Sequence, residues 1–192
     1  NLIYKKEQKM SRDNLNKNIE KCKEFNEILN DILSNETVQE MNKYIQHGEI
    51  SCYSHCYYVA YYTYLICKKL KLDYKSAARG AMLHDLFLYD WHTTSPSDIN
   101  EKGAHAWAHP RIALKNATKI FNLNKTEQDI IKNHMWPVTI KFPKTKEAFI
   151  VSCMDKYSAT AETYTNCRNK ITNSRIYRYA YVFLCLFIFR IF

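Results

Sequence analysis

Only three glycines and four prolines occur in the 192 residues of this chain. Folds with many strands need frequent turns, and glycine and proline supply the backbone geometry of most turns. A β-sandwich or a doubly wound sheet is therefore not expected. Because 46% of the residues are hydrophobic and 24% are charged, the chain can bury a core. These features predict an all-α fold, and the length suits a single domain.

Hydrophobic periodicity predicts where the helices lie. Apolar residues recur at three- and four-residue steps over residues 11–33, a second short helix is expected over 36–46, and a long Tyr-rich helix over 52–70. Asp73 is placed to cap a helix that runs from about 75 to 89. The remaining predicted elements are a polar loop over 92–108, helices over 110–121 and from about 126 to before 137, and a last helix over 145–164.

Two of these helix starts are predicted from local signals. Pro110 fits the first turn of a helix, which puts His109 at or just before the helix start. The segment Thr126-Glu-Gln-Asp129 resembles a capping box that opens the next helix.

No internal repeat or low-complexity linker divides the chain, so we expect one domain with three regions. These are N-terminal helices over 1–48 that pack on the core, a central region over 49–164, and a basic, apolar C-terminal segment over 165–192. Residues 177–192 are nearly all apolar but fall short of the roughly 20 residues that span a bilayer. We expect no transmembrane helix there, but a helix that covers the core or joins copies in a homo-oligomer. A membrane-surface anchor is the alternative.

Charge and cysteine usage exclude several classes of protein. The net charge is +9, but basic residues form no consecutive block, so a dedicated nucleic-acid surface is not expected. A basic rim around a site for an anionic substrate is compatible with this distribution. The seven cysteines include no C-x-x-C pair, which argues against a disulfide framework or a zinc ribbon. The N-terminus has no hydrophobic stretch of signal-peptide length, so we expect a cytoplasmic protein.

Ionisable residues inside apolar segments are the strongest chemical signal. His84 and Asp85 are adjacent within Ala-Met-Leu-His-Asp-Leu-Phe-Leu, His55 lies among tyrosines and valine, and Asp155 follows Phe-Ile-Val-Ser-Cys-Met. Burying such groups is costly unless they are paired or bind a metal. One site alone could be a hydrogen-bonded core residue, but four such residues on three different predicted helices favour a shared metal site.

The order His55, His84-Asp85, Asp155 resembles the HD domain superfamily of metal-dependent phosphohydrolases. The resemblance covers about residues 50–160. His109 in Ala-His-Pro-Arg and His134 in Lys-Asn-His-Met-Trp-Pro extend the pattern to that of the two-metal branch.

The resemblance implies a single helical HD-type domain with a central binuclear metal site. His55, His84, Asp85 and Asp155 would hold the first metal. Asp85, His109 and His134 would hold the second, with Asp85 as the bridge and with His84 and Asp85 as the catalytic pair. Histidine and carboxylate ligands without thiolate suit two divalent transition metals such as Fe, Mn, Co or Ni.

The implied activity is hydrolysis of a phosphate ester of a small molecule or nucleotide by metal-bound hydroxide. The alternative enzyme is a mixed-valent diiron oxygenase with the same ligands, although its usual Tyr and Glu gating residues are not located here. A nucleotide-binding regulator without catalysis is a third interpretation, which the complete ligand set disfavours. The His-Asp-Ile-Gly-Lys and Gly-Tyr-Pro motifs of members that cleave cyclic dinucleotides are absent, so that substrate is not expected.

Four further residues are candidates for substrate binding. Lys156 could bind phosphate but turns about 100° from Asp155 on a helix, and Arg79 lies five residues before His84. His92 and His105 flank the predicted loop and could contact substrate from a lid, or the loop could be an ordinary polar connection with aromatic anchors.

Overall fold

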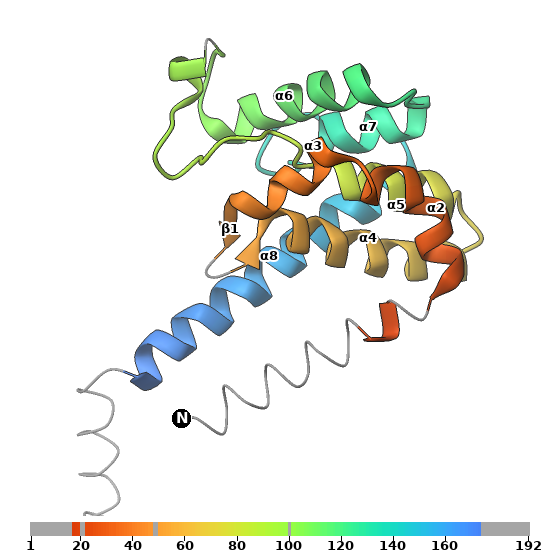
Figure 1. The fold of residues 1–192 in the computed structure, drawn as a ribbon, viewed down its shortest axis with the longest axis horizontal. Helices are drawn as coiled ribbons and strands as arrows, with labels where there is room; N and C mark the ends of the chain where they lie inside the picture. The colour runs from red at the N-terminus through yellow and green to blue at the C-terminus, as the bar shows by residue number, and fades with distance from the viewer. Residues whose placement is uncertain (1–16, 20–21, 48–49, 100, 174–192) are drawn as a thin grey trace, which may run out of the picture.

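The computed structural model describes residues 17–19, 22–47, 50–99 and 101–173 (Figure 1). The expected all-α fold is confirmed, since the sheet in these ranges is one antiparallel pair of short strands. In chain order the elements are α2 (Lys23–Leu33), α3 (Glu36–Gln39), the 3-10 helix η1 (Glu40–Lys43), β1 (Ile45–His47), β2 (Ile50–Ser51), α4 (Cys52–Lys69), α5 (Tyr74–Leu83), the 3-10 helix η2 (Pro96–Ile99), α6 (His105–Ile120), α7 (Lys125–Asn133) and α8 (Lys146–Asn173).

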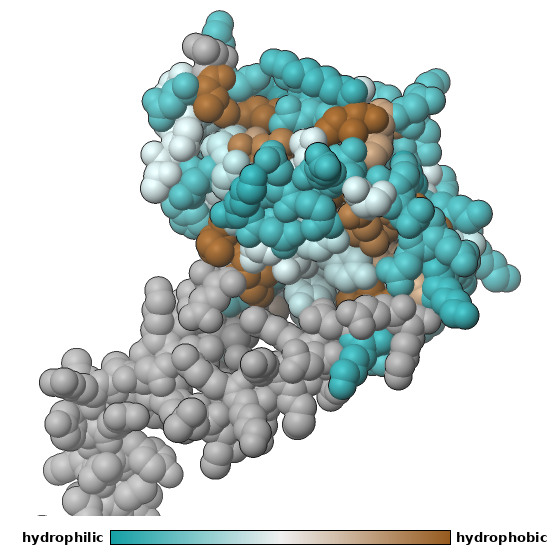
Figure 2. All heavy atoms as spheres, viewed as in Figure 1, coloured by the Kyte–Doolittle hydropathy of each residue, from teal (hydrophilic) through white to brown (hydrophobic). Residues whose placement is uncertain are grey.

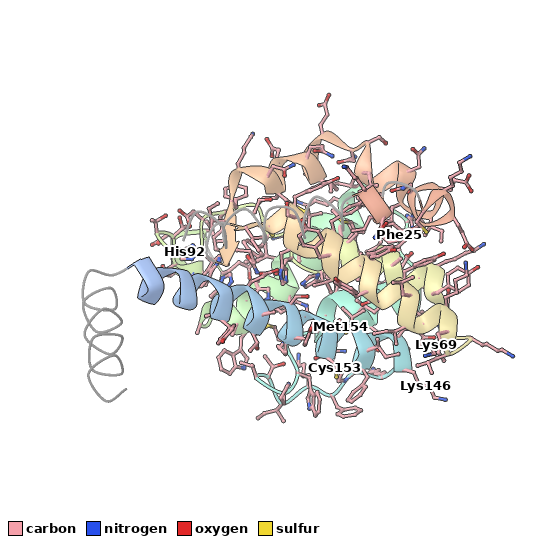
Figure 3. The ribbon with its side chains drawn as sticks, turned by 90° about the horizontal axis from the view of Figure 1, so that it is seen from below. Phe25, Lys69, His92, Lys146, Cys153 and Met154 are labelled. Carbon is pink, nitrogen blue, oxygen red and sulfur yellow. The ribbon has the colours of Figure 1, made fainter. Side chains whose placement is uncertain are left out.

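Helix α4 is the centre of the fold. It packs against α5 and α8, while α5 also packs against α7, and α6 covers α7 (Figure 1). Lys69 at the end of α4 and Lys146 at the start of α8 lie at the same end of the molecule (Figure 3). At this end the Asp73 backbone N–H donates to Glu147 Oε1 at 3.0 Å. Because α4 and α8 are antiparallel, the first turns of α4 face the middle of α8.

The N-terminal helix α2 packs onto this core through aromatic contacts. It buries Phe25, Leu29 and Ile32. The Phe25 ring lies 5.4 Å from the rings of both Tyr61 and Tyr64, centroid to centroid. Rings at this separation attract beyond simple area burial. The Tyr-rich sequence of α4 is therefore partly explained by its contact with α2.

Two predicted helices near the N-terminus are shorter in the structure. The helix predicted over 11–33 is interrupted at Cys22, which precedes α2. The Asn26 side-chain amide donates to the carbonyls of Ile19 and Cys22 and so satisfies backbone oxygens at the break. The helix predicted over 36–46 ends at Lys43, and the chain continues into β1. That strand has three residues, too few for an alternating pattern to be read.

The helix predicted over 52–70 and the Asp73 cap are confirmed, because Asp73 Oδ1 accepts from the Ser76 N–H at 3.1 Å. The following helix, however, ends at Leu83 rather than at 89. His84 is its C-cap, and Leu88 has a φ of 57°, which no helix accommodates. Asp85 therefore lies just beyond the helix.

Three more boundaries differ from the prediction. Helix α6 begins at His105, so Pro110 lies inside it and His109 is in its second turn rather than at its start. The capping box of α7 is formed by Asn124 and Glu127 instead of residues 126–129. Helix α8 continues to Asn173, beyond the predicted end at 164.

Hydrophilic side chains cover most of the described surface on the face shown in Figure 2, with hydrophobic residues gathered in separate patches. Residues 177–192, where we expect a core-covering helix or a contact between copies, lie outside the described residues. None of the helices within the described ranges combines the length and apolar character needed to cross a bilayer. The region boundaries at 48/49 and 164/165 and the cytoplasmic location stay predictions.

Candidate metal centre

Six buried side chains contributed by five helices lie close together next to the start of α4. They are His55 of α4, His84 and Asp85 at the end of α5, His109 of α6, His134 at the C-cap of α7, and Asp155 of α8. None is more than 6% exposed. The structure thus brings together all six residues that the sequence singled out as metal ligands.

Three of the imidazole rings are held in the same tautomer by the backbone. Nδ1 of His84 lies 2.6 Å from the Ala81 carbonyl, Nδ1 of His109 lies 2.8 Å from the His105 carbonyl, and Nδ1 of His134 lies 2.9 Å from the Ile131 carbonyl. A carbonyl only accepts, so each Nδ1 carries the proton that it donates. In the neutral ring, Nε2 is then left with a free lone pair.

These lone pairs point at one another and at a carboxylate. Nε2 of His109 and Nε2 of His134 are 2.9 Å apart. Asp85 Oδ1 lies 3.3 Å from the first and 3.4 Å from the second. Two unprotonated nitrogens and a carboxylate oxygen repel one another unless a proton or a cation lies between them. This donor set is typical of a divalent transition-metal site.

The electrostatic surroundings favour the ligand forms of His134 and Asp85. Burial lowers the pKa of His134 to about 4, so its ring is neutral at neutral pH. Burial opposes ionisation of Asp85, but the neighbouring rings of His84, His109 and His134 hold the pKa of this carboxyl well below its usual range. A neutral imidazole and an ionised carboxylate are the states that bind metals.

The second half of the cluster is centred on Asp155. Its Oδ1 lies 3.1 Å from His55 Nε2 and 3.6 Å from His84 Nε2. Burial opposes its ionisation, yet the neighbouring His55 and His84 rings and the charge of Lys156 keep the pKa of Asp155 well below its usual range. Nε2 of His84 is buried and has no hydrogen-bond partner among the described residues. An unsatisfied buried nitrogen facing two carboxylates fits a site for a cation.

Within the described residues, three overlapping triads of this cluster could each hold a metal ion. In each triad the candidate ligand atoms lie within 4.8 Å of one another. The triads are His55, His84 and Asp85; His84, His134 and Asp155; and Asp85, His109 and His134. The residues present therefore fit bound metal, and Asp85 belongs to two of the triads.

Glu162 is a residue of the site that the sequence analysis missed. Both of its carboxylate oxygens lie 3.1 Å from His55 Nδ1. A carboxylate behind a histidine orients the ring and increases its basicity as a ligand. The available signal was its position seven residues after Asp155, since two helical turns put both residues on one face of α8.

Gln46 is the second site residue that the sequence analysis missed, and no feature of the sequence indicates its role. Its Nε2 donates to Asp85 Oδ2 at 2.5 Å from strand β1, 39 residues earlier in the chain. The residue is 7% exposed, and its Oε1 has no hydrogen-bond partner among the described residues. Gln46 thus restrains Asp85 on the side away from His109 and His134.

The four candidate substrate residues divide into two near the cluster and two away from it. Lys156 Nζ lies 2.7 Å from Asp155 Oδ2 and 2.9 Å from the His134 carbonyl, so it borders the cluster. His105 stacks on His109 with ring centroids 4.6 Å apart, and its Nδ1 lies 2.8 Å from the Tyr89 hydroxyl.

Arg79 and His92 lie elsewhere. The Arg79 guanidinium bonds both carboxylate oxygens of Asp31 and Oε1 of Glu127, so it joins α2 to α7 and does not face the cluster. His92 is exposed and contacts Asp90 at the surface (Figure 3). Its neighbour Trp91 stacks on His105, with ring centroids 5.1 Å apart, and so connects the loop to α6.

Buried thiols border the cluster without forming disulfides. Cys52 Sγ lies 3.3 Å from the Asp85 carbonyl, and the free cysteines include Cys22, Cys52, Cys56, Cys67 and Cys153. Burial raises the pKa of both Cys52 and Cys56, so both are thiols at neutral pH.

Comparison with known protein families gives one match. The HD domain family matches residues 52–160, which include all six residues of the cluster. Gln46 and Glu162 lie outside the matched range. Searches of curated proteins and of solved structures found no significant match.

Proposed function

Because the chain belongs to the HD domain family, we propose that its histidine–aspartate cluster is the binuclear centre of a metal-dependent phosphohydrolase. The substrate would be a phosphate ester of a small molecule or nucleotide. The observation that carries this proposal is the convergence of Nε2 of His84, His109 and His134 on Asp85, with each Nδ1 engaged by a backbone carbonyl.

In this proposal the six residues hold two ions. His55, His84, Asp85 and Asp155 would hold one, and Asp85, His109 and His134 would hold the other, with Asp85 shared. When bound, two such metals generate a hydroxide nucleophile near neutral pH and neutralise charge on the phosphoryl oxygens. Six protein ligands leave positions open for water and substrate.

The chain's own groups preorganise this centre. The backbone carbonyls behind three rings fix their tautomers and directions, and Glu162 does the same for His55 from α8. Gln46 donates to one oxygen of Asp85 and leaves the other oxygen facing His109 and His134. Loss of such a hydrogen bond to a metal ligand commonly lowers metal affinity or activity 10- to 100-fold.

The position of Lys156 favours an anionic substrate at this site. Its side chain is 30% exposed and its ammonium group lies 2.7 Å from Asp155 Oδ2, so Lys156 is close to the cluster and partly open to solvent. A substrate phosphate oxygen at the metal site would replace Asp155 as the partner of the Lys156 ammonium group. Lys156 is therefore the side chain that we assign to substrate charge.

The experiment that tests the reaction compares two activities of the same preparation. The full chain is loaded with Mn²⁺ or Fe²⁺, and phosphate release from a panel of phosphomonoesters and nucleotides is measured alongside oxygen consumption. We expect phosphate release that is lost in Asp85→Asn and retained in His92→Gln, which alters an exposed histidine. Substrate-dependent oxygen consumption without phosphate release would replace the hydrolase with the diiron oxygenase.

A further inference from the structure

A concave site lies where α7 meets α6 and the segment before α8. The cavity measures about 580 Å³. It is lined by Leu114, Lys125, Gln128, Asp129, Lys132, Asn133, Lys141, Phe142 and Lys144. None of the six residues of the metal cluster is among them. The cavity is therefore a separate site, and a ligand bound in it would not depend on the proposed hydrolase activity.

Four lysines give this cavity a concentrated positive charge. Lys125 and Lys132 come from α7, and Lys141 and Lys144 from the segment that leads to α8. All four are exposed, and no carboxylate among the described residues forms a salt bridge with them. Like charges gathered around one hollow repel one another, and a bound anion relieves that repulsion.

The one acidic residue in the lining forms no ion pair with these lysines among the described residues. Asp129 is 9% exposed, and its Oδ1 accepts from Asn133 Nδ2 at 2.7 Å. Its Oδ2 accepts from the backbone N–H groups of Lys144 and Thr145 at 2.9 and 2.8 Å. Asp129 thus anchors the Lys144 backbone to α7 and fixes the shape of the cavity, while the lysine ammonium groups stay available.

An aromatic ring completes the lining. Phe142 is 60% exposed although it packs edge-on against Trp136, with ring centroids 5.1 Å apart. A large apolar side chain held in place yet open to solvent offers a flat surface for a planar ligand. Another cavity, of about 380 Å³, has a single lysine beside a glutamate and no aromatic residue.

We propose that this cavity binds a nucleoside polyphosphate, with its phosphates on the four lysines and its base on Phe142. The volume lies within the range of about 300–1,000 Å³ that is usual for small-molecule sites. Lysine is a common partner of phosphate as a point charge, and charge-assisted hydrogen bonds are about twice as strong as neutral ones. The combination of several cations with one exposed ring matches a ligand that carries both phosphates and a base.

The test is calorimetric titration of the full chain at low salt with the β,γ-methylene analogue of a nucleoside triphosphate and with inorganic tripolyphosphate. We expect one analogue per chain, and a Kd that rises at least about tenfold in Lys132→Glu/Lys141→Glu. The matched control Lys69→Glu/Lys75→Glu makes the same change of net charge on α4 and α5, and should leave the Kd within about twofold. Asp85→Asn should retain the binding.

Three outcomes would overturn the proposal. Equal weakening in both double variants means attraction by net charge alone. Loss of binding in Asp85→Asn places the ligand at the metal cluster. Phe142→Leu should weaken the analogue but not tripolyphosphate, and an unchanged Kd for the analogue contradicts the role of the base. Circular dichroism and the unfolding midpoint of each variant establish that the surface changes leave the fold intact.

Discussion

Gln46 contacts the cluster although it lies outside the residues that match the HD domain family. Its contribution to metal binding can be tested with a single substitution. Its amide donates to Asp85 Oδ2 at 2.5 Å. Gln46→Met keeps the length of the side chain but removes the donor, so Asp85 loses one restraint. We expect metal affinity to fall about 10- to 100-fold, measured by competition with a chromophoric chelator. The control is Gln39→Met, whose amide lies at the surface, and equal affinities in both variants would refute this role.

The buried His134 ring makes the free energy of unfolding of the metal-free chain depend on pH. Burial lowers its pKa to about 4 in the folded chain, whereas its unperturbed value is 6.5. Between these values the unfolded chain binds more protons, so the contribution of His134 to the free energy of unfolding falls as the pH is lowered from about 6.5 to 4. The stability difference between metal-free wild type and His134→Gln should therefore shrink over this window.

Urea unfolding at several pH values, in the presence of a chelator, measures that difference. His92→Gln serves as the matched control because His92 is exposed, and its difference from wild type should stay flat. A difference for His134→Gln that stays constant from pH 7 to pH 4 would show that this ring is not held neutral by burial.

The ligand residues could be predicted from the sequence, while their supports could not. His84-Asp85 and Asp155 stand out because charged groups in apolar segments need a partner. Glu162 and Gln46 do not stand out, since a glutamate in a polar helix and a glutamine in a three-residue strand are ordinary. Their roles depend on contacts across 107 and 39 residues, which only the tertiary fold creates.

Among the elements, α7 allows a direct comparison of the sequence-based and the observed cap. The sequence pointed to Thr126, but Asn124 accepts from the Glu127 N–H at 2.9 Å and Glu127 Oε2 accepts from the Asn124 N–H at 2.8 Å. We expect Asn124→Ala to lower the free energy of unfolding by about 1–2 kcal/mol. Thr126→Ala should change it by less than about 0.5 kcal/mol. Thermal or urea unfolding measures both, and the reverse order would contradict the observed cap.

Helix α6 shows why boundaries were harder to predict than helices. Pro110 suits a first turn, but the observed helix starts five residues earlier because the Ala104 carbonyl accepts from the N–H groups of Trp107 and Ala108. Stacking of His105 on Trp91 and on His109 then holds that extra turn. Tertiary contacts outweighed the local proline signal. By contrast, α4 and the start of α5 after Asp73 followed the local pattern, since the apolar face of α4 and the cap of α5 are encoded in adjacent residues.

At the scale of the whole molecule, the cluster joins five helices, so bound metal should stabilise the entire fold. A ligand at 100 times its Kd adds about 2.7 kcal/mol to the free energy of unfolding. For a chain of this size that corresponds to a rise in Tm of about 5–10 °C. Differential scanning calorimetry with metal and then with excess chelator measures the shift. Asp85→Asn should have the same Tm under both conditions.

The most direct test of the central claim is the metal content of the purified full chain, measured by elemental mass spectrometry without chelator. The account predicts about two transition-metal ions per chain in the wild type and in His92→Gln. Asp85→Asn removes the carboxylate charge shared by the two proposed metals while the site otherwise keeps its shape. The account predicts that this variant loses metal and that its helical circular dichroism is unchanged. If Asp85→Asn holds as much metal as the wild type, the assignment of this cluster as the metal centre is wrong.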